Sequence, residues 1–190
     1  SLFYRGFFVI KFQLLIIGRS VKMATLILKD TYLELEEEMK SINKLRSKTA
    51  LQIQEAADHG DLKENYEYKA AKEKMEFVIY KKQLLQSHVP FTFIEYREIK
   101  TDVVGFGNKV RILEEGKNEA EDYYLLGPIE SELDLYPLVV TYHAPFAKAM
   151  IGKKINEDFK LEINGKDIKF KIIAIEKITA TTPKCPRKSL

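Results

Sequence analysis

Two long stretches without glycine or proline, separated by Gly60, constrain the fold of this chain more than any other feature of its sequence. The first runs from Asp30 to Ala57 and places apolar side chains at alternating steps of three and four residues, with Arg46 as a polar interruption. This heptad spacing is typical of a long helix that buries one stripe. The predicted stripe comprises Tyr32, Leu35, Met39, Ile42, Thr49, Ile53 and Ala56.

The second stretch runs from Asp61 to His88 and has similar spacing, with a polar patch at Glu73 and Lys74. Two amphipathic helices that meet at one glycine are expected to fold back as an antiparallel hairpin. At 1.5 Å per residue the rod is ~40 Å long. Because so thin a rod buries little surface, another unit must anchor its open end. The second predicted stripe comprises Leu62, Tyr66, Ala70, Phe77, Tyr80 and Leu84.

After the helices the pattern changes to short alternating segments that indicate strands. The clearest signal is Asn164-Gly165, a two-residue turn between the alternating segments 159–163 and 168–172. A short helix is expected at 145–151, ended by Gly152. These features predict a small domain that mixes strands with little helix.

We therefore predict an α+β chain with an N-terminal antiparallel two-helix coiled-coil hairpin at residues 23–90. A linker with some strand character, 91–101, joins it to a small α+β domain at 102–178. Residues 179–190 are rich in Thr, Pro and Lys and are expected to form a flexible basic tail.

The positive charge of the chain lies at its two ends. The formal net charge is +3, but residues 1–22 contribute +4 and residues 181–190 another +3, so residues 23–180 carry −4. A field that draws nucleic acid to the whole protein is not supported. The single cysteine, Cys185, excludes a disulfide framework within the chain.

Residues 1–22 contain a thirteen-residue apolar run that Lys11 and Gln13 interrupt. This run is short of the ~20 residues that cross a bilayer, and no Ala-x-Ala-like cleavage site follows it. Met23 reads like a natural start. We expect residues 1–22 not to belong to the working protein; an export or membrane segment is the alternative.

The turn between the helices holds two carboxylates, Asp61 and Glu64, three residues apart at a helix start. They can form a capping box, in which Asp61 accepts backbone N–H bonds and Glu64 reaches back. They can also meet a metal ion from the far end of the rod, because Mg²⁺ prefers carboxylate oxygens. The two interpretations are compatible, since a cap uses one oxygen and leaves another.

Two separate motifs resemble the bacterial GreA/GreB family of transcript cleavage factors, and the tip is nearer to the GreA pattern. The tip reads Gly-Asp-Leu-Lys-Glu-Asn from Gly60, followed by Glu-Tyr and Ala-Ala-Lys-Glu. The second motif, Ala-Pro-Phe-Ala-Lys-Ala-Met-Ile-Gly-Lys from Ala144, is similar to the family's Ser-Pro-Ile-Ala-Arg-Ala-Leu-Ile-Gly-Lys segment. The resemblance covers about residues 25–178.

This resemblance implies an FKBP-like C-terminal domain that docks on RNA polymerase at the secondary channel, and a hairpin that enters the channel. Asp61 and Glu64 would complete a Mg²⁺ site shared with the polymerase, and the ion would activate water to cut backtracked RNA near its 3′ end. The protein would not be an enzyme itself. It would meet DNA only indirectly, would not bind membranes, and would work in the bacterial cytoplasm.

Other residues gain expected roles by the same resemblance. Lys72, with Lys69 one turn away, would face the extruded RNA, although both lysines also suit a solvated helix face. Pro145, Phe146 and Lys148 fall in the motif assigned to docking. The sequence departs from the family at Ala57, where an arginine is frequent, and at Ala144, where the family has serine. Its usual acidic stretch is only partly echoed, by Glu130, Glu132 and Asp134.

Tyr66 is expected to pack on the apolar stripe, whereas Tyr68 lies off it and is free to touch RNA or polymerase. Three other functions stay open: a channel inhibitor without cleavage activity, an FKBP-type prolyl isomerase, and a plain coiled-coil adaptor. The intact tip motif argues against the inhibitor. An isomerase requires an aromatic-lined pocket, and the few aromatics of the second domain are expected to serve its core.

Overall fold

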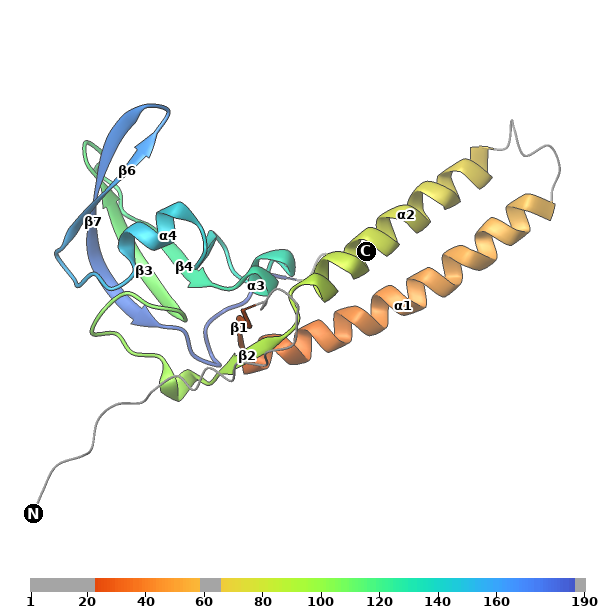
Figure 1. The fold of residues 1–190 in the computed structure, drawn as a ribbon, viewed down its shortest axis with the longest axis horizontal. Coiled ribbons are helices and arrows are strands. Elements are labelled where there is room, and N and C mark those ends of the chain that lie inside the picture. Colours follow the sequence, from red (N-terminus) through yellow and green to blue (C-terminus); the bar gives the residue numbers. More distant parts are fainter. Residues whose placement is uncertain (1–22, 59–65, 187–190) are drawn as a thin grey trace, which may run out of the picture.

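Two antiparallel helices form a long hairpin that projects from a β-rich domain (Figure 1). The computed structural model describes residues 23–58 and 66–186. Helix α1 spans Lys29–Asp58 and helix α2 spans Tyr66–Ser87. The predicted α+β fold is confirmed. Throughout the described ranges, no helix has a stretch long and apolar enough to cross a membrane.

The predicted stripe of α1 is confirmed at its centre. Leu35, Ile42, Thr49 and Ala56 are buried at intervals of seven residues, so that each lies above the last on one face of the helix. The side chains become smaller from Leu35 toward Ala56. The two helices therefore meet through small side chains at the end farthest from the β-rich domain.

The predicted stripe of α2 is wrong by one residue. Ala71, Val78 and Leu85 are buried, again at intervals of seven, while Phe77 is 55% exposed and Tyr80 is 61% exposed. A shift of one residue turns the buried face by about 100°. The aliphatic row is buried because it packs against the small and medium side chains of α1. Large rings at these positions would hold the two helices apart.

A short parallel ribbon closes the open end of the hairpin. Strand β1, Thr25–Leu28, leads directly into α1, and strand β2, Phe91–Ile94, follows α2. The two pair in parallel from Thr25 opposite Phe91 to Leu28 opposite Ile94. The expected linker 91–101 thus holds a strand and a short 3₁₀ helix, η1, Tyr96–Glu98.

The second unit is built on a five-stranded sheet in the order β5-β4-β3-β7-β6. Neighbouring strands are antiparallel except for β4 and β5. Its elements are β3 Asn108–Glu114, β4 Glu121–Leu126, α3 Pro128–Glu132, β5 Val139–Thr141, α4 Pro145–Met150, β6 Asp158–Ile163 and β7 Lys166–Lys177. The Asn164-Gly165 hairpin is confirmed, with positive φ at both residues as its two-residue turn requires. The short helix predicted at 145–151 is α4.

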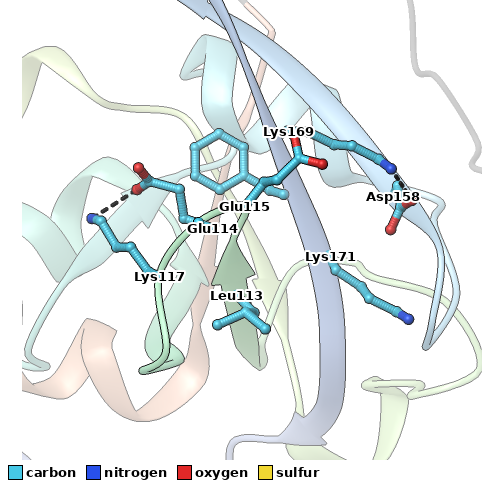
Figure 2. Close-up of a pocket in the computed structure, with 9 residues that line it drawn as sticks. Leu113, Glu114, Glu115, Lys117, Asp158, Lys169 and Lys171 are labelled. Atoms are coloured by element: carbon cyan, nitrogen blue, oxygen red, sulfur yellow. Dashed lines mark ion pairs between the residues drawn. The ribbon is translucent and has the colours of Figure 1, made fainter.

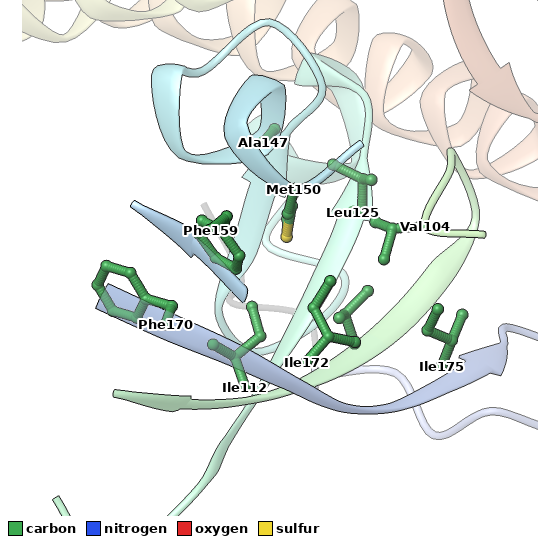
Figure 3. Packing of buried hydrophobic residues seen from close by; sticks show 10 residues of the cluster. Val104, Ile112, Leu125, Ala147, Met150, Phe159, Phe170, Ile172 and Ile175 are labelled. Carbon is green, nitrogen blue, oxygen red and sulfur yellow. The ribbon is translucent and has the colours of Figure 1, made fainter. Parts of the chain in front are cut away.

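The main core lies between this sheet and α4 (Figure 3). Ala147 and Met150 project from α4 onto Ile112 and Ile172 of the sheet, and all four are at most 3% exposed. Phe159 and Phe170 stack with their ring centroids 5.2 Å apart and complete the cluster. This core belongs entirely to the C-terminal unit.

Two further clusters join the hairpin to that unit. Leu28, at the end of β1, packs with Leu126, Tyr136 and Ile178 of the C-terminal unit. Conversely, Ile129 of α3, in the C-terminal unit, packs among apolar residues of the hairpin. Hydrophobic contact therefore crosses the boundary from both sides.

The C-terminal segment adds polar contacts at the same boundary. Residues 179–190 are expected to be a flexible tail, but their described part, up to residue 186, has specific partners. The Cys185 N–H donates to the Leu135 carbonyl at 2.8 Å, and Lys184 Nζ pairs with Glu34 of α1 at 3.3 Å. Through Lys184 this segment reaches from the C-terminal unit to the base of the hairpin.

Gly127 lies against the backbone of the hairpin base at Leu26. A Cβ at this position would lie 2.4 Å from the Leu26 carbonyl oxygen, which is backbone and cannot move aside cheaply. We expect Gly127→Ala to lower the free energy of unfolding by roughly 1–3 kcal/mol, measured by urea denaturation. Gly105→Ala is the control, because the nearest atom to its Cβ would be 3.9 Å away. Equal stability of the two variants would contradict this contact.

Candidate functional site

The far end of the hairpin is framed by the last residue of α1, Asp58, and the first of α2, Tyr66. The predicted site residues Asp61 and Glu64 lie outside the described residues. With 30 residues, α1 carries its last turn ~45 Å from β1. The structure therefore places both flanks of the tip motif far from the C-terminal unit (Figure 1).

The first turns of α2 present cations and aromatic rings together. Lys69 and Lys72 are exposed, and Lys72 Nζ lies 5.5 Å from the centroid of the Tyr68 ring. This is the distance of a cation–π contact, which holds the ammonium group over the ring. The side chain of Tyr66 is 82% exposed.

This arrangement differs from what the sequence predicts for Tyr66. The prediction that Tyr66 packs on the helix stripe is wrong, because its ring stands in solvent. Tyr68, predicted to lie off the stripe, is half-buried and has Lys72 over its ring, and its contact with RNA or polymerase stays a prediction. The signal that was missed is the one-residue shift of the α2 stripe, which turns Tyr66 outward along with Phe77 and Tyr80.

A cleft opens between the two helices behind the tip. Glu55 and Gln52 line it from α1, and Glu67 and Lys74 line it from α2, with alanines at its floor. In the described ranges, no group of three or more His, Cys, Asp or Glu side chains is arranged to hold a metal ion.

The second predicted motif forms α4 and the turn before it. Pro145 occupies the first turn of the helix and is exposed, as is Lys148. Phe146 is half-buried, with its ring centroid 5.2 Å from those of Tyr123 and Phe170. Its ring therefore serves the domain core, and Pro145 and Lys148 remain on the exposed surface of α4.

The aromatic residues of the C-terminal domain pack against one another, some edge to face and some stacked. Phe146 and Phe159 lie 5.5 Å apart, and Tyr124 stacks on Tyr136 at 5.2 Å. Rings packed in this way do not line an open, concave pocket. The expectation that the aromatics serve the core is confirmed for these residues.

A hollow at the end of β3 carries charges of both signs (Figure 2). Lys117 Nζ lies 2.7 Å from Glu114, and Lys169 Nζ lies 3.0 Å from Asp158. The carboxylate partner raises the pKa of each lysine. Because each of these charges has an opposite neighbour, the hollow lacks the one-signed field that would collect a charged ligand.

Two family models match the chain, one for each unit. Residues 25–89 match the N-terminal model of the transcription elongation factors, and residues 99–177 match the C-terminal GreA/GreB model. The chain belongs to the GreA/GreB family of transcription elongation factors. The resemblance found in the sequence is thereby confirmed, and the tip motif and the motif that begins at Ala144 each fall within one matched range.

Two curated relatives are named as members of the same family. Transcription elongation factor GreA of Thermodesulfovibrio yellowstonii is 34% identical over 146 residues, which is 76% of this chain and 91% of that protein. GreA of Pelobacter propionicus is 32% identical over 150 residues, 78% of this chain and 94% of the relative. Among solved structures, Gfh1 of Thermus thermophilus aligns over 81% of this chain and 99% of its own, with 18% identity and a TM-score of 0.38.

Proposed function

We propose that this protein binds RNA polymerase at its secondary channel and stimulates cleavage of backtracked nascent RNA by the polymerase's own active site. The observation that carries the proposal is the placement of the tip motif. It joins the far ends of two helices, one of them ~45 Å long. A narrow rod of this length suits a channel that a globular domain cannot enter.

The donor set of the tip suits a shared Mg²⁺ ion. Asp61 and Glu64 are both carboxylates, and Mg²⁺ is bound through one or two protein carboxylates plus water and phosphate oxygens. Two carboxylates alone leave most of an octahedral shell open, as expected for ligands that complete a site held largely by another protein. When bound, the ion supplies an activated water for phosphodiester hydrolysis.

The described flank of the tip supports contact with RNA. Lys69 and Lys72 supply exposed positive charge for phosphates, and Tyr66 supplies an exposed ring on which a base can stack. The remainder of the protein has little need to touch nucleic acid, and DNA is met only through the polymerase. Such a factor works where bacterial transcription takes place, in the cytoplasm.

A stalled elongation complex tests the proposed function. The complex, with radiolabelled RNA and Mg²⁺, is incubated with and without the protein, and RNA length is followed on a gel. We expect the 3′ end to shorten faster with the protein present and elongation to resume when nucleotides are added. Binding without shortening would favour the channel inhibitor instead.

Lys148 tests the docking side of the proposal. Exposed charge on a docking surface steers association and contributes to affinity, so we expect Lys148→Glu to weaken polymerase binding roughly tenfold or more. Lys166→Glu, at the exposed β6–β7 turn, is the control with the same charge change. Fluorescence anisotropy with labelled protein measures both. Equal affinities would remove α4 from the docking surface.

A further inference from the structure

Strand β1 has its outer edge closed by side chains of the C-terminal domain. It pairs with β2 along one edge, so the N–H groups of its other edge need separate acceptors. The Leu26 N–H donates to Tyr142 Oη at 3.0 Å, and the Leu28 N–H donates to Glu130 Oε1 at 2.9 Å. More than 100 residues separate each donor from its acceptor. The two bonds therefore connect the hairpin base to the C-terminal domain.

Glu130 joins both sides of this boundary with one carboxylate. Its second oxygen, Oε2, accepts from the N–H of Gly127, the residue just before α3, at 3.1 Å. The side chain is fully buried, and burial raises its pKa while the bonds from Leu28 and Gly127 act to lower it. An ionisable side chain is seldom fully buried unless it is hydrogen-bonded or paired with an opposite charge.

The position of Glu130 matters because Leu28 immediately precedes α1. The carboxylate lies at the N-terminal end of that helix, where unpaired N–H groups and the helix dipole favour negative charge. The bond thus holds the N-terminal end of α1, at the base of the hairpin, against the C-terminal domain. Apolar contacts of Ile129 and Leu28 surround the same place, but such contacts are not directional. Hydrogen bonds restrict angle as well as distance.

A small change in the angle between the hairpin and the C-terminal domain at this base moves the tip a long way. Along a helix of ~45 Å, a rotation of about 10° displaces the far end by about 8 Å. Metal ligands tolerate errors of only a fraction of an ångström. The aim of the hairpin must consequently be set at its base.

We propose that Glu130 is a positioning residue that fixes the direction of the hairpin relative to the C-terminal domain, with Tyr142 as its weaker partner. The catalytic consequence rests on the proposed function: the carboxylate aims the tip acids at the polymerase active site. The structural part of the inference, a fixed hairpin direction, holds for the free protein.

Glu130→Gln isolates this role. The amide has the same shape as the carboxylate but only one acceptor oxygen, so whichever way it turns, either Leu28 or Gly127 loses its acceptor. Tyr142→Phe removes the bond to Leu26 and keeps the ring. Glu132→Gln is the matched control, because it makes the same change on the same short helix at an exposed position.

Interspin distances in the full-length protein give the direct measurement. Spin labels are attached at Ala50→Cys on α1 and Glu162→Cys on β6, both exposed positions, with Cys185→Ala removing the native thiol. We expect Glu130→Gln to broaden the distance distribution, Tyr142→Phe to broaden it less, and Glu132→Gln to leave it unchanged. Ala50 lies about 33 Å along α1 from Leu28, so each 10° of added freedom at the base moves the label there by roughly 6 Å.

Unchanged distances in folded Glu130→Gln would overturn the inference. If that variant does not fold, Tyr142→Phe decides, and a parental distribution there would equally overturn it. This readout needs no polymerase, so it stands even if the parent protein fails to stimulate cleavage and the proposed function falls.

Cleavage kinetics supply the second readout. With the unlabelled variants we expect Glu130→Gln to lower the maximal cleavage rate roughly 10- to 100-fold, as misplaced reacting groups do. The protein concentration that gives half of the maximal effect should stay the same, because the docking domain is intact. A rise in that concentration with an unchanged maximal rate would contradict a positioning role.

Discussion

Replacing Asp61 by asparagine is expected to remove most of the cleavage stimulation and to leave folding almost unchanged. Asparagine caps a helix about as well as aspartate, so the capping interaction survives. The negative charge that a Mg²⁺ ligand needs is lost. Outer-shell partners of metal ligands are already worth 10- to 100-fold, so loss of a direct ligand should lower the cleavage rate by roughly 100-fold or more.

Glu64→Gln should behave in the same way, because glutamine retains the reach for a capping box but not the charge. Asp58→Asn is the matched control, since Asp58 is an exposed carboxylate at the end of α1 and outside the tip motif. Melting temperature, polymerase binding and RNA cleavage are measured for all three variants. Higher Mg²⁺ concentration should partly restore cleavage by the two tip variants, because the lost interaction is with the metal.

Polymerase binding separates this prediction from a general loss of function. Docking is assigned to the C-terminal domain, so both tip variants should bind polymerase normally and compete with the parent protein. If Asp61→Asn stimulates cleavage at the parental rate, the Asp61 carboxylate acts only as a helix cap, and the proposed mechanism is wrong.

The sequence was sufficient to predict α1 because its apolar residues leave one choice of face. Leu35, Ile42 and Ala56 lie on a heptad row, and the opposite face is charged. Hairpins and helices that depend on local signals could be predicted equally well. The Asn164-Gly165 turn and the glycine-ended helix α4 are set by residues a few positions apart.

The buried face of α2 could not be predicted in this way. Two rows on α2 have helical spacing, one with Phe77 and Tyr80 and the other with Val78 and Leu85. Side-chain size favours the first row, yet the structure buries the second. The choice depends on the shape of α1 opposite, which a pattern within α2 does not contain.

Contacts between distant segments were missed for a related reason. Glu130 resembles a surface acid in the sequence, and nothing in its neighbourhood indicates that its partner is the backbone of Leu28. Tyr142 likewise reveals its role only through Leu26. The tip acids show the reverse case, since a motif indicates Asp61 and Glu64 although they lie outside the described residues.

Two adjacent residues of α2, Val78 and Phe77, provide a direct test of which face is buried. Val78 is 2% exposed and packs with Ile42 and Leu85, whereas Phe77 is 55% exposed. A carboxylate at position 78 must be buried without a partner or force the helices apart. We expect Val78→Asp to lower the free energy of unfolding by about 3–5 kcal/mol, the usual cost of an uncompensated buried charge.

Phe77→Asp is the matched control, because it introduces the same charge one position away on the solvent side and should change the free energy of unfolding by well under 1 kcal/mol. Urea denaturation followed by far-UV circular dichroism at 222 nm, which reports mainly on the helices, measures both variants. Clusters that include Leu28 and Ile129 cross the domain boundary. The helices and the sheet should therefore lose stability together in Val78→Asp. If Phe77→Asp were instead the more damaging variant, the aromatic row would be the buried one, and the helix register described for α2 would be wrong.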